Sequence, residues 1–278
     1  MPGRENGFKL FTGGKLPYLQ SPALSDNTLI DHAFSTRKGG CSEGPFKSLN
    51  TGYHTGDKWE CVVENRNRFM RIFDYDYRFL TSSVQVHGTE IGVFDKANRG
   101  EGALPETARR QCDALVTEEP GLPLAAYSAD CQLIYFAAFR KKPVIALVHA
   151  GWRGTLGNIG GKTVNFFKHH YAVEPEILTA VLSPAICRRC YLVDQELSSK
   201  FQAAGWFDSA YLAPAAGEGF ELDLAAVNTT QLIQSGIKKE NIARTSWCTS
   251  CSTDLFYSYR RDQGLTGRML GFIAIKGS

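Results

Sequence analysis

The sequence predicts a single α+β domain in which mixed β-sheets are flanked by helices. Strand-like apolar runs recur along all 278 residues, and helical patterns lie between some of them. No linker separates the chain into two halves. Several runs, such as PVIALVH at 143–149, are apolar on both alternating faces, which is typical of strands that are covered on both sides.

We expect strands in a series of short apolar runs. In chain order these runs are 30–36, 82–87, 112–117, 122–130, 133–139, 143–149, 176–184 and 269–275. The stretch LAPAAGEGF at 212–220 contains few residues that favour strands. We therefore predict that this stretch is a surface loop.

Helical spacing of apolar residues predicts helices over 58–73, 159–171 and 223–235. Asp223 is a suitable N-cap for the last of these, which ends before Gly236. The stretch GNIGGKT nearly matches a phosphate-binding loop, but Leu156 stands where that motif requires glycine. We interpret it as a turn into a helix.

Composition limits the classes of partner and compartment. The chain has 31 basic and 28 acidic residues, a balance that favours neither nucleic acid nor membrane surfaces as partners. It has no apolar run of membrane-spanning length, and its first residues lack the apolar core of a signal peptide. We therefore expect a cytoplasmic protein whose eight cysteines are thiols, metal ligands or catalytic groups rather than disulfides.

Three predicted strands end on side chains that bind metals. SVQVHG ends at His87, AYSADC at Cys131 and VIALVHAGWRG at His149. Two histidines and a cysteine suit a three-ligand site with an open fourth position, for zinc or copper. The same residues allow another chemistry, in which Cys131 is a nucleophile with a histidine as base and Asp130 as its orienting partner. Sequence spacing alone does not bring the three segments together.

A second group of cysteines forms two CxxC pairs. CRRC contributes Cys187 and Cys190, and CTSC contributes Cys248 and Cys251. Paired CxxC motifs are typical of structural zinc, although the separation of these two is longer than in a zinc ribbon. A second metal site and four ordinary thiols both remain open.

Two long polar stretches are candidates for binding a substrate. The glycine-rich stretch 35–57 carries Arg37 and Asn50, and the stretch 254–269 carries Arg260 among aromatic residues. Arginine recognises phosphate through its planar guanidinium, and aromatic rings stack on flat bases. A solvated surface is the alternative interpretation of both.

Seven segments, taken together and in order, resemble one known family. They are FSTRKGGCSEGPFKSLNTGYHTGD, QVHGTE, CDALVT, SADCQLIYF, VHAGWRGT, LSPAICRRCYLVD and DLFYSYRRDQGLTGRM. The set is similar to the YfiH-like laccase-domain family, also described as multicopper polyphenol oxidases, which includes the animal FAMIN protein. The resemblance covers roughly residues 30–275 of a single domain spanning 1–278.

This resemblance implies a layered α/β/β/α fold and a zinc site formed by His87, Cys131 and His149. It implies phosphorolysis of adenosine, inosine, guanosine and methylthioadenosine, together with deamination of adenosine. Purine nucleosides and phosphate are then the partners. Other descriptions of the family leave two alternatives: copper-dependent oxidation of phenols, and a cysteine-type amidase that edits peptidoglycan precursors. Multicopper centres need many histidines, and this chain has six.

The matching motifs also give expectations for individual residues. We expect Cys131, Asp130 and Arg260 to take part in catalysis. The residues expected to bind nucleoside or phosphate are Arg37, Asn50, Gln85, Arg153 and Tyr257.

Overall fold

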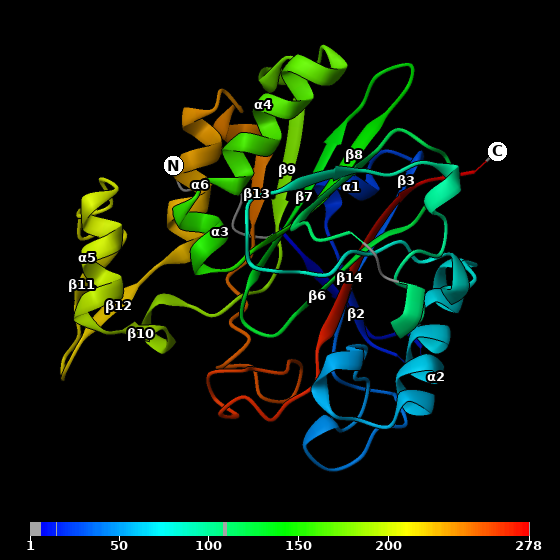
Figure 1. Ribbon diagram of the computed structural model, residues 1–278, viewed down its shortest axis with the longest axis horizontal. Helices are drawn as coiled ribbons and strands as arrows, with labels where there is room; N and C mark the ends of the chain where they lie inside the picture. Colours follow the sequence, from blue (N-terminus) through cyan, green and yellow to red (C-terminus); the bar gives the residue numbers. More distant parts are fainter. Residues whose placement is uncertain (1–6, 15, 108–109, 278) are drawn as a thin grey trace.

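Two large β-sheets pack face to face in the computed structural model, which describes residues 7–14, 16–107 and 110–277 (Figure 1). The first sheet has five strands and is antiparallel throughout. In spatial order its strands are β1 (Lys9–Phe11), β2 (Tyr18–Gln20), β3 (Ile30–Ser35), β14 (Met269–Ile275) and β6 (Leu124–Ser128).

The second sheet has six strands and is mixed, because the strand at each edge runs parallel to its neighbour. Its spatial order is β13 (Ile242–Arg244), β9 (Leu178–Leu182), β7 (Gln132–Ala138), β8 (Val144–Ala150), β5 (Ala114–Thr117) and β4 (Ile91–Val93). Helix α1 (Pro22–Ser25) precedes β3 of the first sheet.

Helices cover the outer faces of both sheets. Helix α4 (Ile159–Tyr171) and helix α6 (Leu224–Gln234) pack on the six-stranded sheet, and helix α2 (Trp59–Met70) packs on the five-stranded sheet. Alternation along β7 follows from this arrangement, since Tyr135 faces the other sheet and Phe136 faces the helices. The predicted α/β/β/α layering is confirmed.

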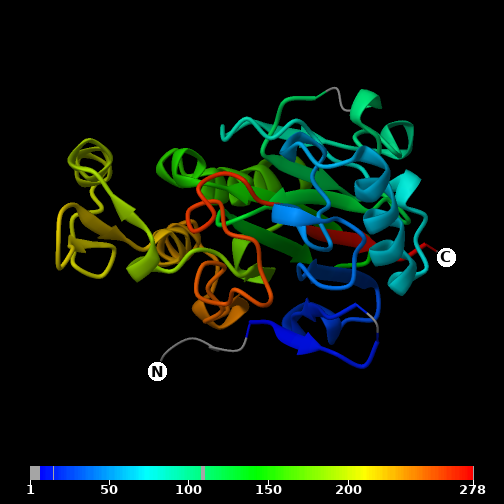
Figure 2. The same cartoon turned by 90° about the horizontal axis from the view of Figure 1, so that it is seen from below.

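A third, three-stranded sheet extends from one end of the molecule with helix α5 (Gln195–Ala203), as Figures 1 and 2 show. Its strands are β10 (Leu192–Val193), β12 (Phe220–Leu222) and β11 (Leu212–Pro214). The prediction of a surface loop over 212–220 is therefore wrong at both ends of this range, which lie in strands. A short turn that includes Gly219, at φ +90°, joins two antiparallel strands there.

The predicted strand over 82–87 is also wrong. This segment is extended but has only an isolated bridge, from Val84 to Gln111. Side chains satisfy much of its backbone instead, because the carboxylate of Asp113 accepts hydrogen bonds from the amides of Val86 and His87. Val84 and Val86 are exposed.

The three predicted helices are confirmed: the helix over 159–171 has the predicted bounds, and the ends of the other two differ by one to three residues. Asp223 is the N-cap of α6, where its carboxylate accepts a hydrogen bond of 2.8 Å from the amide of Ala226. The segment after His149 forms a short helix, α3 (Trp152–Leu156), before α4 begins. In the described part of the chain, no helix is long and apolar enough to cross a membrane.

One buried histidine makes stability depend on pH. His32 on β3 is fully buried, and its Nε2 accepts a hydrogen bond of 2.8 Å from the amide of Ser21. Burial lowers the pKa of His32 from 6.5 to about 3. Below pH 6.5 the unfolded chain therefore binds a proton that the folded chain does not.

We expect His32 to reduce the free energy of unfolding by about 1.4 kcal/mol per pH unit as the pH falls from 6.5 towards 3. Above pH 6.5 the imidazole is neutral in both the folded and the unfolded chain, so His32 no longer makes the free energy of unfolding depend on pH. Denaturant unfolding from pH 7 to pH 4.5 will measure the slope. In the His32→Gln variant this part of the slope should vanish, and an unchanged slope would contradict the assignment.

Candidate metal centre

Three ligand side chains from separate segments meet at one end of the sheets. The ligand atoms of His87, Cys131 and His149 all lie within 4.8 Å of one another. Ligand atoms of a tetrahedral zinc ion lie about 3.3–3.8 Å apart, given bonds of about 2.0–2.3 Å, so the three side chains can reach one ion by moving inward. The imidazole rings of His87 and His149 lie 4.8 Å apart at 79°.

Strand pairing brings Cys131 and His149 together. Strands β7 and β8 are antiparallel, with Leu133 opposite His149, so the residue just before β7 lies beside the end of β8. His87 enters from the extended segment between η4 (Tyr77–Phe79) and β4, with φ +59°. His149 is buried and His87 is exposed, so the cluster opens to solvent on the side of His87.

Asp113, which sequence reasoning missed, fixes the orientation of the cluster. This fully buried carboxylate lies 2.8 Å from Nδ1 of His149. It also accepts hydrogen bonds from the amides of His87 (3.0 Å) and Gly88 (2.7 Å). With Nδ1 of His149 held by a carboxylate, Nε2 is the nitrogen left to bind a metal, an arrangement common around histidine ligands.

The signal for Asp113 in the sequence is weak. Asp113 directly precedes the apolar strand β5, a position where polar residues without a function are common. Only the pairing of β5 with β8, which places Ala114 opposite Val148, brings Asp113 alongside His149.

The charges of the cluster favour a thiolate at Cys131. Burial alone would raise the pKa of Cys131, but His149 and His87 outweigh it and lower the pKa to about 6. Burial alone would lower the pKa of His149, but the Cys131 thiolate and Asp113 raise it to about 9. Deprotonated sulfur is the form that binds metals and also the form that acts as a nucleophile. The pair therefore suits either chemistry.

Gly151 leaves space beside the ligands. A Cβ atom built on it would lie 3.0 Å from Sγ of Cys131 and 3.1 Å from Cδ2 of His87. Its φ of −73° and ψ of −178° are open to any residue, so glycine is needed here for space rather than for conformation.

We expect Gly151→Ala to weaken metal binding by about 10-fold, the low end of the loss seen when the surroundings of metal ligands are disturbed. Competition with a chelator will measure it. Gly217→Ala is the matched control, because a Cβ there meets nothing within 4 Å. Equal metal affinity in the Gly151→Ala variant and the wild type would contradict the steric argument.

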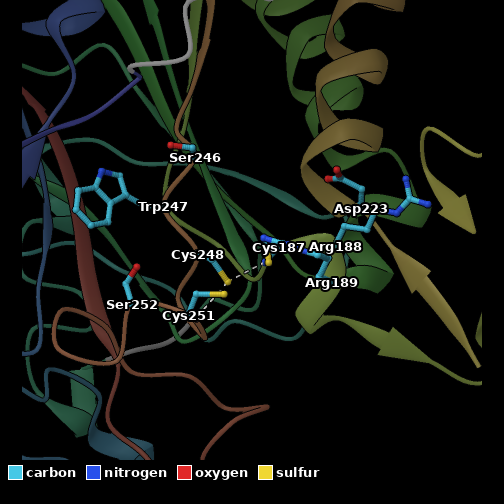
Figure 3. A pocket seen from close by; sticks show the side chains of 9 residues that line it. All are labelled: Cys187, Arg188, Arg189, Asp223, Ser246, Trp247, Cys248, Cys251 and Ser252. Atoms are coloured by element: carbon cyan, nitrogen blue, oxygen red, sulfur yellow. Dashed lines mark hydrogen bonds between the residues drawn. The ribbon is translucent and has the colours of Figure 1, made fainter. Parts of the chain in front are cut away.

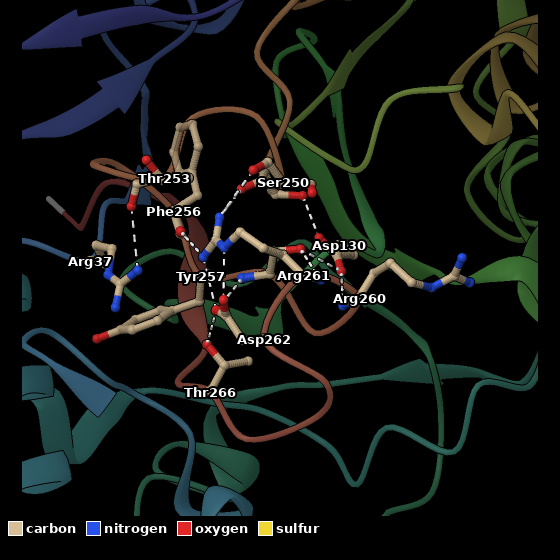
Figure 4. Close-up of polar contacts among 12 residues, drawn as sticks. Arg37, Asp130, Ser250, Thr253, Phe256, Tyr257, Arg260, Arg261, Asp262 and Thr266 are labelled. Atoms are coloured by element: carbon tan, nitrogen blue, oxygen red, sulfur yellow. Dashed lines mark hydrogen bonds and ion pairs between the residues drawn. The ribbon is translucent and has the colours of Figure 1, made fainter. Parts of the chain in front are cut away.

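The carboxylate of Asp130 holds the 249–260 segment in place (Figure 4). It accepts hydrogen bonds from Oγ1 of Thr249 (2.6 Å), Oγ of Ser258 (3.0 Å) and the amide of Arg260 (2.7 Å). Asp130 itself has φ +90°, and it is buried next to Cys131. Its side chain thus connects the metal centre to the segment that carries Arg260.

Two of the expected substrate-binding residues use their side-chain amides within the fold. The amide of Gln85 pairs with the backbone of Tyr127, through bonds of 2.8 and 2.9 Å. Asn50 is buried, donates to Thr55 and Asp57, and accepts from the amide of Arg268.

Arg37 and Tyr257 lie against each other (Figure 4). The guanidinium of Arg37 lies 4.7 Å from the ring centre of Tyr257 and donates to the carbonyl of Thr253. Tyr257 is fully buried, and its hydroxyl donates to the carbonyl of Phe46 at 2.6 Å. The exposed aromatic side chain of this stretch is Tyr259.

Two cationic side chains share a region with Tyr191 and the centre. Arg153 is exposed and stacks on Trp152, with its guanidinium 4.1 Å from the ring centre. Arg260 lies over Tyr191 at 4.8 Å and donates to the carbonyl of Leu192. Tyr191 interacts electrostatically with Cys131 and with both arginines, so all of them share one region.

Two further basic residues near the centre, Arg268 and His54, were not expected from the sequence. Burial lowers the pKa of Arg268, and the negative charge of Cys131 opposes this effect. Partial desolvation, with added repulsion from Arg268 and from the histidine ligands, lowers the pKa of His54 to about 4. Their only signal was membership of the two long polar stretches 35–57 and 254–269.

Comparison with known proteins agrees with this fold. The sequence profile of the family described as multi-copper polyphenol oxidoreductase laccase matches residues 31–276. The crystal structure of the hypothetical protein YfiH from Bacillus licheniformis superposes with a TM-score of 0.90 at 34% identity, covering 98% of this chain and 100% of that one. YlmD from Geobacillus stearothermophilus gives the same TM-score and identity, covering 98% and 99%.

Several curated relatives of this chain are named after an enzymatic activity. The chain is 39% identical to the purine nucleoside phosphorylase YlmD of Geobacillus stearothermophilus, over 86% of this chain and 88% of that protein. It is 35% identical to the purine nucleoside phosphorylase of Deinococcus radiodurans, over 95% of each chain. The chain therefore belongs to the multi-copper polyphenol oxidoreductase laccase family, whose curated members include proteins named purine nucleoside phosphorylases.

Proposed function

We propose that this protein is a purine nucleoside phosphorylase whose active centre is the cluster of His87, Cys131 and His149. The proposed substrates are adenosine, inosine, guanosine and methylthioadenosine, each with inorganic phosphate, and adenosine is also deaminated. The observation that supports this most strongly is a three-ligand cluster that opens to solvent, with Tyr191 interacting electrostatically with its Cys131 and with Arg153 and Arg260. The names of the curated relatives support the same reaction.

The residues of the cluster fit a zinc ion. Asp113 holds Nδ1 of His149, and one soft sulfur and two imidazoles form a ligand set that zinc prefers. Three protein ligands leave a fourth position open for water or substrate. Zinc held there would supply Lewis acidity for the deamination of adenosine.

The positions of the other histidines favour zinc over a multicopper centre. His32 is buried in the core, where its Nε2 accepts a backbone hydrogen bond. His169 and His170 lie at the exposed end of α4, and His54, although near the centre, does not belong to the cluster of ligand atoms. Among the described residues, the groups that could hold a metal include only two histidines, His87 and His149. Four-electron oxidation of phenols needs more copper ligands than these supply.

Phosphorolysis requires an anion site beside the sugar. A phosphate oxygen attacks C1′ of the ribose while the C1′–N9 bond breaks and its electron pair leaves with the purine. We propose that Arg153 and Arg260 bind the phosphate and orient it towards C1′, because both interact electrostatically with Tyr191, as Cys131 does. Their charge also offsets that of the phosphate dianion.

Asp130, which was expected to be catalytic, and several residues expected to bind substrate act indirectly in this proposal. Asp130 positions the backbone of Arg260, and Tyr257 supports Arg37, whose guanidinium is half-buried at the edge of the site. Asn50 and Gln85 shape the surrounding backbone. Because the named relatives are bacterial enzymes that act on small molecules, we also place the protein in the cytoplasm.

We expect Arg153→Met to raise the KM for phosphate roughly 10- to 100-fold, the worth of a hydrogen bond to a charged group. The KM for inosine should change little, because the nucleoside does not need this charge. Steady-state kinetics with each substrate varied in turn will separate the two constants. Arg71→Met, at an exposed arginine that directly follows α2, is the control. A phosphate KM that stays at the wild-type value would remove Arg153 from the site.

The activity itself is tested with purified, zinc-loaded protein. Incubation with inosine and phosphate should release hypoxanthine and ribose 1-phosphate, and adenosine without phosphate should give inosine and ammonia. The Cys131→Ser variant, prepared in the same way, controls for contaminating phosphorylase. If no purine nucleoside yields free base, the proposal is wrong.

A cysteine-type hydrolase is the second candidate, and the charges of the cluster favour it. A thiolate at Cys131 beside a protonated His149 is the form of a cysteine nucleophile. Alkylation with iodoacetamide distinguishes the two functions. Under our proposal zinc blocks the modification of Cys131, whereas a free nucleophile is alkylated equally with and without zinc.

A further inference from the structure

A second group of ligands lies outside this centre. Cys187 directly precedes the 3-10 turn Arg188–Cys190, and Cys190 ends it. Cys248 and Cys251 lie in a turn that follows β13. The four sulfur atoms all lie within 4.8 Å of one another. The two CxxC motifs, separated by 57 residues in the sequence, are therefore adjacent in space.

The backbone aligns the two turns independently of any metal. Ala185 and Cys248 form a parallel bridge, and the carbonyl of Ala185 accepts a hydrogen bond of 3.1 Å from the amide of Thr249. Rigid pairing of this kind places both turns in register. The convergence of the sulfur atoms thus rests on main-chain hydrogen bonds as well as on the side chains.

The sulfur of Cys248 accepts two backbone hydrogen bonds. The amide of Cys187 donates to it at 3.2 Å, and the amide of Cys251 donates at 3.4 Å (Figure 3). Amides that point at a sulfur atom stabilise a thiolate there. The bond from Cys251 to Cys248 spans three residues, so the turn folds back on its own first cysteine.

The sulfur separations suit one metal ion better than disulfides. Sγ of Cys190 lies 3.4 Å from Sγ of Cys251, whereas a disulfide bond is about 2.05 Å long. Two sulfur atoms of a tetrahedral zinc–thiolate site are about 3.8 Å apart, given a Zn–S bond of about 2.3 Å. All four cysteines are free thiols here.

The cluster is accessible to an ion from solvent. A pocket of about 470 Å³ is lined by Cys187, Cys248 and Cys251 together with Arg188, Asp223 and Trp247 (Figure 3). Cys248 is buried, but Cys251 is exposed at the rim. A metal has a route into the site, and the ring of four protein ligands leaves no position for a substrate.

We propose that Cys187, Cys190, Cys248 and Cys251 bind a structural zinc ion that is separate from the catalytic centre. Four thiolates select a soft, tetrahedral ion, and zinc is the common one. This proposal does not depend on the phosphorylase activity, because none of the four cysteines belongs to the first cluster.

The ion would join two segments that line the first centre. Tyr191 directly follows Cys190, and Thr249, which donates to Asp130, directly follows Cys248. Arg261 adds hydrogen bonds of 3.0 and 3.2 Å to the carbonyls of Thr249 and Ser250 (Figure 4). The zinc site would therefore stabilise the positions of Tyr191 and of the segment that carries Arg260.

Metal analysis of the Cys131→Ser variant tests the proposal without disturbing the four cysteines. We expect about two zinc ions per chain in the wild type, one in Cys131→Ser and none in Cys131→Ser/Cys251→Ser. X-ray absorption of the zinc in Cys131→Ser should show sulfur ligands only, at about 2.3 Å. Cys61→Ser, which removes a half-buried thiol elsewhere, should keep both ions.

Thermal unfolding provides a second measurement. Removal of zinc from Cys131→Ser with a chelator should lower its Tm, and zinc should restore it. The same treatment should leave the Tm of Cys131→Ser/Cys251→Ser unchanged. Cys131→Ser protein that binds no zinc, or that binds zinc through nitrogen or oxygen ligands, would overturn the proposal.

Discussion

Cys131→Ser is expected to lose its catalytic metal and at least about 100-fold of its phosphorolytic activity. Disturbing the partners of metal ligands already costs 10- to 100-fold, and removing a ligand costs more. Serine keeps the size of the side chain but supplies no thiolate. Initial rates with inosine and phosphate, measured beside the metal content, will test this expectation.

His87→Ala separates the two possible roles of Cys131. If Cys131 is a ligand, His87→Ala loses metal and activity in parallel with Cys131→Ser. If Cys131 is a nucleophile paired with His149, loss of His87 leaves that pair intact and much of the activity remains. Cys61→Ser serves as the control for thiol loss, because Cys61 lies outside both cysteine-containing clusters.

Asp113→Asn should weaken metal binding about 10- to 100-fold, although Asp113 is not itself expected to bind the metal. The carboxylate holds Nδ1 of His149 at 2.8 Å and accepts from several backbone amides. Burial alone would raise the pKa of Asp113, but His149 and these amides lower it, so the group is ionised. Asparagine keeps the shape and removes the charge that orients His149.

Competition with a chelator will measure the metal affinity. A variant that is only less stable keeps the wild-type metal affinity as long as it stays folded. Asp95→Asn provides the matched control, because Asp95 also accepts a backbone hydrogen bond, from Ala97, but is exposed at the start of a turn. Metal affinity in Asp113→Asn that equals that of Asp95→Asn would show that the carboxylate does not position His149.

The sequence predicts the central strands well because burial on two faces leaves a clear pattern. Strand β8 lies within the predicted 143–149 run apart from one residue, and its residues are buried on both faces. The unit formed by α5 and β10–β12 was not predicted. Its strands have only two or three residues, too few for a period of two to be visible. Segment 82–87 does not form the predicted strand because hydrogen bonds from side chains replace those of a neighbouring strand there.

The candidate ligands could be predicted from the sequence, but the residues that position them could not. His87, Cys131 and His149 belong to recognisable motifs, whereas Asp113 reaches His149 only through the pairing of β5 with β8. Tyr191 and Arg268 likewise depend on contacts between segments far apart in the sequence. Such contacts are properties of the tertiary fold, so no local pattern reveals them.

Anomalous diffraction at the zinc absorption edge, from crystals of zinc-loaded protein, tests the central claim most directly. We predict a peak within about 2.0–2.3 Å of Nε2 of His149, Sγ of Cys131 and a ring nitrogen of His87. Active crystals that show no peak between these three side chains would contradict the account.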